Sequence, residues 1–284
     1  MTEQVTWRQA VAGAARVLAD AGVPSPQVDA RLLAEHVLGA PLVHAPAVPG
    51  PEHLARYAAL VERRARREPL QHLTGTMAFR HLTLHAGPGA FVTRPETEVV
   101  AGAAIDATRE IAGAGRAPLV VDLCSGSGAI ALAVATEVPA AVVHAVELSE
   151  AALALARRNV AEHAPHVRLH AGDAATALPE LDGTVDVVVS NPPYIPPDAV
   201  PIDPEVRDHD PDLALYGGGA DGLDVPRAVV TAAGRLLAPG GRFVMEHAEL
   251  QAEAAAEMLT RAGFTGVWTG RDLSGRPRFV TATR

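Results

Sequence analysis

The spacing of hydrophobic residues divides the chain near residue 75. In the first part, apolar residues such as Val11, Ala14 and Leu18 recur at the spacing of one helix face. Glycine and proline interrupt this pattern at 22–26 and 41–51, where a helix cannot continue. The pattern therefore predicts a small bundle of three helices, the second over 28–38 and the third over 54–67.

Residues 77–93 have a different pattern of short alternating segments. Phe79–Leu84 and Ala90–Thr93 alternate apolar and polar positions, and Gly87-Pro88-Gly89 lies between them. This predicts a β-hairpin that connects two domains. The segment Arg94-Pro95-Glu96-Thr97-Glu98 then starts a helix, because proline and acidic residues favour a first helical turn.

After residue 115, short apolar runs alternate with helical segments. Strands are predicted over 119–123, 142–147, 167–171, 185–190, 241–246 and 279–283, with a weaker one over 267–269. Helices are predicted between them over 129–137, 149–163, 225–237 and 250–262. Such a series builds a mostly parallel, doubly wound α/β sheet. Residues 196–222 show no clear secondary structure, and a loop of that length in a compact domain is usually functional.

Composition narrows the class of protein. The formal charge of −9 and the pI near 5.7 disfavour a nucleic-acid backbone as the main partner, because phosphate binding needs a basic surface. Cys124 is the single cysteine, which excludes disulfide frameworks and fits a reducing compartment. Met1–Gln4 begin no basic and apolar leader, and no apolar run is long enough to span a bilayer. We therefore expect a cytoplasmic protein, a monomer with no membrane partner and no metal.

A glycine loop follows the first strand of the sheet. The run Asp122–Gly128 passes from strand to helix, and its glycines let the backbone approach a ligand. Glu147, at the end of the second strand, is placed to accept hydrogen bonds from ribose hydroxyls. By itself this pattern fits NAD, FAD or another nucleoside cofactor. Asp122 would repel a pyrophosphate but suits a cationic group, which favours S-adenosyl-L-methionine.

Two further strands also end in polar residues. Asp173, in Gly172-Asp173-Ala174, is placed to accept a hydrogen bond from an adenine amino group. Asn191-Pro192-Pro193-Tyr194 follows the fourth strand, and its two prolines hold it rigid. Open α/β sheets bind their ligands at the carboxyl ends of strands. An amide held stiffly at that edge is suited to grip another planar, hydrogen-bonding group.

These motifs resemble those of the class I S-adenosylmethionine-dependent methyltransferases, and within them the release factor glutamine methyltransferases of the HemK type. The resemblance covers nearly the whole chain and rests also on Glu68–Gly75, Arg94–Glu98, Glu205-Val206-Arg207 and Glu246–Gln251. It implies a Rossmann-like methyltransferase domain over 94–284, a β-hairpin linker over 76–93, and a helical substrate-recognition domain over 1–75. Asn-Pro-Pro-Tyr is shared with DNA adenine and some ribosomal RNA methyltransferases, so it specifies amino-group methylation rather than the substrate.

The resemblance also implies roles for single residues. Those expected to bind the cofactor are Asp122, Cys124, Ser125, Gly126, Ser127, Gly128, Glu147, Asp173, Ala174 and Asn191. Those expected to hold the substrate glutamine are Asn191, Pro192, Pro193 and Tyr194, with Asn191, Pro192 and Tyr194 as the catalytic ones. Five positions depart from the family pattern. Cys124 and Ala248 stand where glycine is usual or common, His72 where tyrosine is expected, Ala174 where an aromatic residue often covers adenine, and Thr93 where the family often has proline.

An amide nitrogen is a weak nucleophile because its lone pair is delocalised into the carbonyl. We hypothesise that the Asn191 side-chain oxygen and the Pro192 carbonyl each accept one N–H of the glutamine amide. This would turn the nitrogen toward the sulfonium methyl group, while Tyr194 packs on the amide plane. No general base is needed if the proton leaves after attack.

Other residues have a less specific interpretation. The arginines in 63–67 are either a contact for a partner or, as is usual for a run of charges on a helix, a solvated face, which is the preferred interpretation. Glu96 and Glu98 either orient a ligand or only favour their helix N-terminus. Cys124 has no histidine near it in sequence to activate it as a nucleophile. A solvated acidic loop is preferred over a metal site for His209 and its neighbours Asp203, Asp208, Asp210 and Asp212.

The substrate implied by the resemblance is the glutamine of the Gly-Gly-Gln motif in a peptide-chain release factor. Three alternatives stay open on residues alone. The first is methylation of a glutamine in a ribosomal protein, and the second is methylation of an amino group of a nucleic-acid base. The third is a non-catalytic or dehydrogenase-type domain.

Overall fold

The computed structural model describes residues 5–284, so the expectation for Met1–Gln4 lies outside the described residues. The chain forms two compact units. One contains the residues up to Thr76 together with Pro201–His209, and the other contains Met77–Val200 together with Asp210–Arg284. Among residues 5–284, no helix combines the length and the hydrophobicity needed to cross a membrane.

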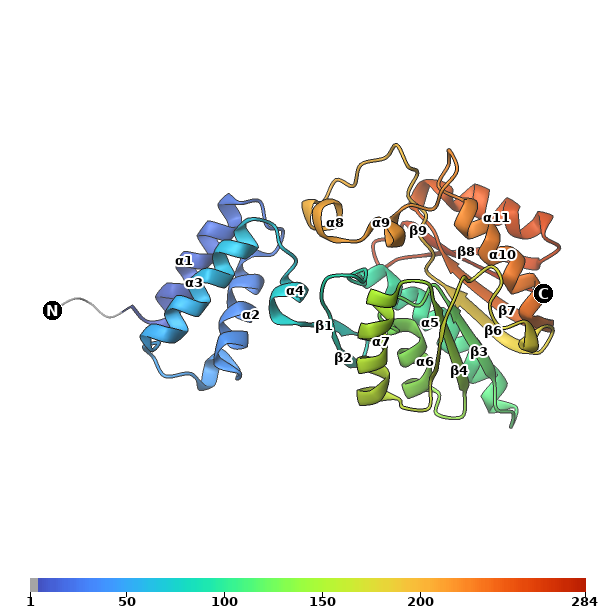
Figure 1. Ribbon diagram of the computed structural model, residues 1–284, viewed down its shortest axis with the longest axis horizontal. Coiled ribbons are helices and arrows are strands. Elements are labelled where there is room, and N and C mark those ends of the chain that lie inside the picture. Colours follow the sequence, from blue (N-terminus) through green and yellow to red (C-terminus); the bar gives the residue numbers. More distant parts are fainter. Residues whose placement is uncertain (1–4) are drawn as a thin grey trace. The chain divides into compact units, whose positions relative to one another are not determined.

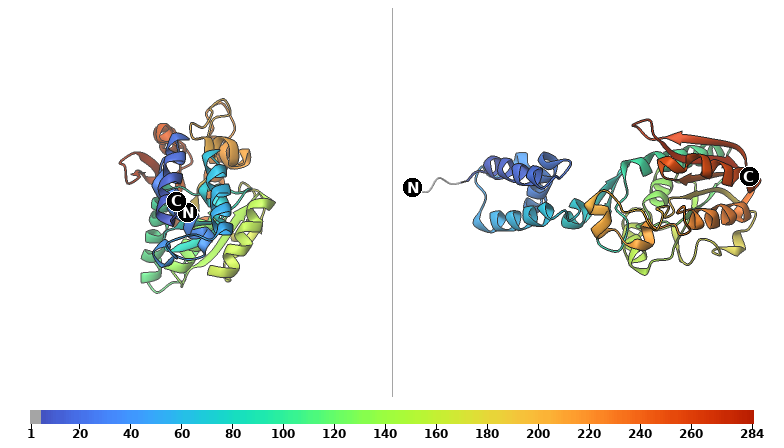
Figure 2. Two further views of the ribbon diagram at one scale, coloured as in Figure 1. Left: turned by 90° about the vertical axis from the view of Figure 1, so that its left-hand side faces the viewer. Right: turned by 90° about the horizontal axis from the view of Figure 1, so that it is seen from above.

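The first unit is a helical bundle. Its helices are α1 (Trp7–Asp20), α2 (Pro26–Leu38), α3 (Pro51–Ala65), the short α4 (Leu70–Thr74) and α8 (Pro204–His209), with a 3₁₀ turn at Leu42–His44. α1, α2 and α3 pack against one another (Figure 2) around fully buried side chains such as Leu18 and Leu33. The three predicted helices are confirmed, although proline starts α2 and α3 slightly earlier than expected because it fits the first helical position.

The second unit is built on a seven-stranded sheet in the order β5-β4-β3-β6-β7-β9-β8 (Figure 1). The strands are β3 (Leu119–Leu123), β4 (Val142–Glu147), β5 (Arg168–Ala171), β6 (Val185–Ser190), β7 (Leu237–Glu246), β8 (Thr265–Arg271) and β9 (Pro277–Thr283). Five strands run parallel, and β9 pairs antiparallel with β7 and β8. The predicted doubly wound α/β sheet is confirmed.

Helices cover both faces of this sheet. α5 (Pro95–Gly113), α6 (Ala129–Glu137) and α7 (Glu150–His163) share one core with strand residues such as Val120. α10 (Asp224–Leu236) and α11 (Ala252–Arg261) share the other core with the neighbouring residue Val121. Alternate residues of the central strands therefore face opposite layers, and both faces are apolar, as the continuous hydrophobic runs predict.

A hairpin is present in the predicted region, but the predicted pairing of its strands is wrong. Its strands are β1 (Thr76–Phe79) and β2 (Leu82–His85), joined by Arg80 and His81, and Ala90–Thr93 form no strand. Arg80 has a φ of 52°, a left-handed conformation that permits this tight turn. Glycine usually marks such a turn in sequence, and here an arginine occupies it, so the pattern pointed to the later Gly87-Pro88-Gly89.

The segment 196–222 was expected to lack secondary structure, and this is also wrong in part. It contains α8 and α9 (Asp212–Leu215), which are too short to show a helical period. Its two ends meet beside Asn191–Tyr194, where the Ile195 amide donates to the Leu215 carbonyl at 2.8 Å and the Gly217 amide to the Ile195 carbonyl at 3.0 Å. The segment is therefore a closed loop anchored directly after the Asn-Pro-Pro-Tyr motif.

Replacing Gly217 with alanine should destabilise this closure. An added Cβ would stand 1.9 Å from the Gly222 carbonyl oxygen and 2.6 Å from the Pro193 carbonyl oxygen, and backbone atoms cannot move aside as flexible side chains do. We expect Gly217→Ala to lower the free energy of unfolding by about 1–3 kcal/mol, as overpacking does. Gly113→Ala is the matched control, because a Cβ there meets no atom within 4 Å. Equal urea unfolding curves for the two variants would contradict this account.

Candidate active site

The pairing register aligns the ends of four neighbouring strands. Val146 of β4, Leu123 of β3, Ser190 of β6 and Met245 of β7 stand in one row across the sheet. The residues one step further on, at the carboxyl edge, are Glu147, Cys124, Asn191 and Glu246. The chain reverses its direction of winding between β3 and β6, and such a switch point is where open α/β sheets bind ligands.

The loop after β3 is shaped by left-handed residues. Cys124, Gly126 and Gly128 have φ values of 61°, 58° and 85°, and Gly128 leads into α6. A Cβ added at Gly126 would meet no atom within 4 Å, so open space lies above the loop. Cys124 adopts a backbone conformation that costs a side-chain-bearing residue about 1–2 kcal/mol, which explains why glycine suits this position. Burial raises the pKa of the Cys124 thiol to about 12, which keeps it protonated and disfavours a role as nucleophile.

Asp122, just before this loop, is completely buried and incompletely paired. Its Oδ2 accepts from the Ala131 amide at 3.0 Å, while Oδ1 has no hydrogen-bond partner among the described residues. Burial raises the pKa of this carboxyl to about 8. The buried hydroxyls of Ser125 and Ser127 also lack partners within residues 5–284. Buried polar atoms normally find a partner, so these three side chains fit a ligand with an amino group, as S-adenosylmethionine has.

Glu147 links the loop to the next helix. Its Oε2 accepts from the Gly126 amide at 2.7 Å and its Oε1 from the Ser149 amide at 2.8 Å. Each oxygen keeps a second lone pair, which suits the ribose hydroxyls expected here. Asp173 lies beyond β5 and accepts from the Ala175 amide at 2.9 Å. Ala174 packs into the core under α10 and α11, and its contact with a cofactor stays a prediction.

Asn191 is oriented by a residue from another element. Its Nδ2 donates to the Thr97 hydroxyl oxygen at 3.3 Å, and Thr97 lies in the first turn of α5 and is 1% exposed. An amide whose nitrogen is held in this way presents its oxygen as an acceptor. The structure thus gives Asn191 the orientation that gripping an N–H group requires.

Tyr194 is held at both ends. Its hydroxyl donates to Glu246 Oε1 at 3.3 Å, and its carbonyl accepts from Gln251 Nε2 at 2.8 Å. Burial raises the pKa of Glu246 to about 7, and the Thr97 hydroxyl that faces it lowers this value only in part. Thr97, Glu246 and the Asn-Pro-Pro-Tyr segment therefore form one buried polar group.

Sequence reasoning missed Thr97 and gave Glu246 no role. Of the two glutamates that flank Thr97, Glu96 is engaged by Arg276 at 3.0 Å. Thr97 shares a helical face with the buried Val100, Ala101 and Ala104, and this periodicity places it inward. Glu246 ends a strand in the same row as Asn191, which is the signal that identified Glu147.

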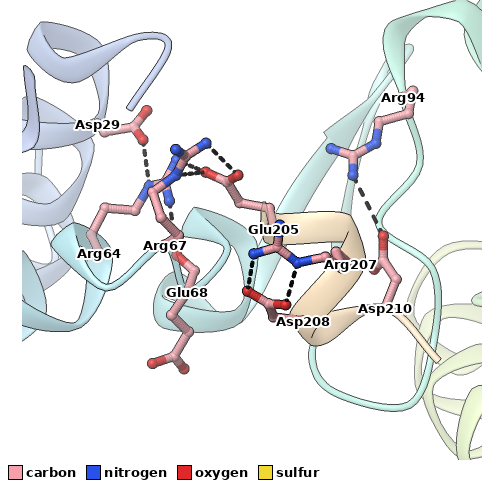
Figure 3. Close-up of polar contacts among 9 residues, drawn as sticks. All are labelled: Asp29, Arg64, Arg67, Glu68, Arg94, Glu205, Arg207, Asp208 and Asp210. Carbon is pink, nitrogen blue, oxygen red and sulfur yellow. Dashed lines mark hydrogen bonds and ion pairs between the residues drawn. The ribbon is translucent and has the colours of Figure 1, made fainter. Parts of the chain in front are cut away.

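Two of the four acidic residues named with His209 pair with arginines, and one of them, Asp210, is buried, so the expectation of a solvated loop is wrong for it. Asp208 pairs with Arg207, and Asp210 pairs with Arg94 at 3.5 Å (Figure 3). Across residues 5–284, no group of three or more His, Cys, Asp or Glu side chains is arranged to hold a metal ion.

Comparisons with known proteins cover both units. The family profile of the PrmC N-terminal domain matches residues 9–75, and that of the methyltransferase small domain matches residues 108–201. The chain is 52% identical to a release factor glutamine methyltransferase of Streptomyces coelicolor, over 96% of each chain. It is 49% identical to the release factor glutamine methyltransferase of Mycolicibacterium smegmatis, over 98% of this chain and 97% of that one.

Solved structures share the fold. A 16S rRNA N2 G1207 methyltransferase of T. thermophilus, in complex with AdoMet and guanosine, matches 74% of this chain and 49% of its own at 23% identity and a TM-score of 0.54. A methyltransferase of Pyrococcus furiosus matches 78% of this chain and 98% of its own at 20% identity and the same TM-score. At these identities the likeness concerns the fold alone.

Glu147→Gln should weaken binding of S-adenosylmethionine. Two backbone N–H groups donate to Glu147, one to each carboxylate oxygen. A glutamine side chain has only one acceptor oxygen, so one of these N–H groups would face the NH₂ group, which is also a donor. We expect the Kd to rise by about 10–100-fold, the effect of losing a hydrogen bond to a charged group, measured by calorimetry. Glu150→Gln, which removes an exposed neighbouring carboxylate, is the control and should leave the Kd unchanged. Equal affinities of both variants would exclude the proposed placement of the cofactor.

Glu246→Gln should change how stability depends on pH. A carboxyl with a raised folded-state pKa holds its proton more tightly when folded, so its contribution is present below the ordinary value of 4.5 and lost as the pH rises through about 7. The free energy of unfolding of the variant, measured in urea relative to that of the unsubstituted protein, should therefore be higher at pH 8 than at pH 4 by up to about 3 kcal/mol. Glu249→Gln, at an exposed position, should show no such gain. A constant difference across this range for Glu246→Gln would contradict the assignment.

Proposed function

Because this chain belongs to the release factor glutamine methyltransferases, we propose that it methylates the side-chain amide nitrogen (N5) of the glutamine in the Gly-Gly-Gln motif of a peptide-chain release factor. The family predicted from sequence is confirmed by these relatives. S-adenosylmethionine is the cofactor of the family, and Asp122, Ser125 and Ser127 fit its amino-acid end. The observation that carries the proposal is the Asn191 amide, oriented by Thr97 beside the glycine loop.

Asn191 acts by positioning the substrate. With Nδ2 held by Thr97, its Oδ1 accepts one N–H of the substrate amide, and the Pro192 carbonyl accepts the other. The substrate nitrogen then turns its lone pair away from both acceptors. Two acceptors also favour the partial positive charge that develops on this nitrogen during attack. When bound, S-adenosylmethionine supplies an electrophilic methyl group on its sulfonium.

Tyr194 closes the site against water. Its hydroxyl and its carbonyl are both engaged, by Glu246 and Gln251, so the ring has a fixed place beside Asn191. The ring packs on the plane of the substrate amide. The nitrogen becomes acidic once it carries the methyl group, and its proton passes to water as the product leaves the site, so no residue has to remove a proton beforehand.

The proposal extends to the rest of the chain. The helical domain over 1–75 recognises the protein substrate, residues 76–93 link it to the methyltransferase domain over 94–284, and the protein acts as a cytoplasmic monomer. Support comes from the match of residues 9–75 to a domain that the family combines with its methyltransferase domain, and from the net charge of −9. Such a charge favours a protein partner over a nucleic acid.

Removal of the Asn191 amide should abolish methyl transfer. We expect Asn191→Ala to lower kcat by at least about 10³-fold, because substrate positioning and charge stabilisation are lost together. The Kd for S-adenosylmethionine should change much less. Transfer of a labelled methyl group to a release factor measures the first quantity and calorimetry measures the second.

Thr97 variants provide the matched control. Thr97→Ser keeps the hydroxyl that accepts from Asn191 and should retain most activity, whereas Thr97→Val keeps the shape and should lose it. Near-normal turnover of Asn191→Ala, or equal turnover of the two Thr97 variants, would refute this mechanism.

A further inference from the structure

The loop that follows Asn191–Tyr194 is shared between the two units. Its base is closed by the backbone hydrogen bonds between Ile195 and residues 215–217 in the second unit. Its central part, Pro201–His209, belongs instead to the first unit. The chain therefore leaves the Asn-Pro-Pro-Tyr motif, contributes α8 to the helical bundle, and returns.

A buried ion-pair cluster holds this segment in the bundle (Figure 3). Arg64 of α3 donates from Nε to Asp29 Oδ2 at 2.7 Å and from Nη2 to Glu205 Oε1 at 2.8 Å. The side chains of these three residues are only 6%, 9% and 11% exposed. A buried charge left without its partner is strongly unfavourable, so each member fixes the others in place.

Arg67 binds the same carboxylate with two hydrogen bonds. Its Nε donates to Glu205 Oε1 at 2.8 Å and its Nη2 to Oε2 at 2.6 Å. Arg67 has a φ of 68° and occupies the position just after the end of α3 that helices usually fill with glycine. The backbone bonds of that ending are present, from the Arg67 amide to Arg64 and from the Glu68 amide to Arg63. The chain thus keeps a strained arginine at this position, where its guanidinium reaches Glu205.

The cluster corrects the interpretation of residues 63–67 as a solvated face. Arg63 and Arg66 do pair with nearby glutamates at the surface. Arg64 and Arg67 instead hold Glu205, and although burial opposes it, their hydrogen bonds lower the pKa of that carboxyl to about 2. Glu205 therefore stays ionised across the physiological range.

The segment held in this way presents an apolar side chain to solvent. Ile202 is 93% exposed and lies between Pro201 and Pro204, which restrict the backbone on both sides. An apolar side chain on a stiff, anchored segment loses little entropy on binding, which suits contact with another protein.

We propose that residues 201–209 are a recognition element for the protein substrate, held in the helical unit by Glu205 with Arg64 and Arg67, with Ile202 as its apolar contact. This rests on the function proposed above. Glu205, Arg64 and Arg67 are positioning residues, since they act through the segment and do not touch the reacting atoms. The loop connects the element directly to the motif that holds the glutamine.

Steady-state kinetics with a release factor test the recognition. Glu205→Gln should raise KM by about tenfold with kcat within about twofold and an unchanged Kd for S-adenosylmethionine. Arg67→Gly should raise KM as well and should lower the melting temperature less than Glu205→Gln does, because Arg64 still pairs with Glu205 and glycine suits the left-handed position. Ile202→Ser should raise KM without changing kcat, the Kd for S-adenosylmethionine or the melting temperature. Glu257→Gln, which removes an exposed, arginine-paired carboxylate from α11, outside the recognition element, is the control and should change none of these.

Hydrogen exchange without substrate tests the tether separately. Amide exchange over 201–209 should be faster in Glu205→Gln and Arg67→Gly and unchanged in Ile202→Ser. Unchanged exchange in the first two variants overturns the tether, and unchanged KM in spite of faster exchange overturns the recognition role. If Glu205→Gln does not fold, amide exchange and KM of Arg67→Gly provide the test of the tether and of the recognition role. Failure of the unsubstituted protein to methylate any release factor overturns the proposed function instead, and leaves the exchange comparison as the test of the tether.

Discussion

The pairing of β6 with β3 on one side and β7 on the other determines where the chemistry can occur. It brings Asn191 level with Cys124 and Glu246, so the glycine loop, the amide and a buried carboxyl meet at one edge without any further device. Register alone does not orient the amide. The orientation of the Asn191 amide depends on Thr97 of α5, whose hydroxyl oxygen accepts from Asn191 Nδ2. The site therefore requires this helix as well as the strand register.

Three buried carboxyls of this protein show two contrasting environments. Asp122 and Glu246 lie beside the glycine loop and the Asn-Pro-Pro-Tyr segment without an arginine bonded to them, and burial raises the pKa of each. Glu205 is bound by two guanidinium groups, which lower the pKa of its carboxyl despite burial. The first kind is costly for folding and is typical of sites that await a ligand or hold a catalytic group. The second kind fixes a segment of chain in place.

Much of this could be predicted because buried parallel strands are visible as continuous apolar runs, and β3, β4 and β6 have the predicted bounds. Residues at the ends of those strands then fall into one row by geometry. What could not be predicted depends on partners distant in sequence. The turn at Arg80 requires a left-handed backbone at an arginine, which sequence does not indicate. α8 is too short to show a helical period of apolar residues. Arg64 belongs to a charged run typical of a solvated helix face, and its burial depends on Glu205, which is distant in sequence. Thr97 lies between two glutamates that favour a helix N-terminus in any case, so only its helical spacing from Val100, Ala101 and Ala104 indicates that it is buried.

We propose above all that the Asn191 site methylates a glutamine amide in a release factor. Peptide mapping by mass spectrometry, after incubation of a purified release factor with the protein and S-adenosylmethionine, tests this most directly. It identifies the substrate and the modified residue in one experiment. We expect the added mass of one methyl group on the glutamine of the Gly-Gly-Gln peptide, and none when Asn191→Ala replaces the unsubstituted protein. An unmodified release factor, together with methyl transfer to a ribosomal protein or to RNA, would contradict it.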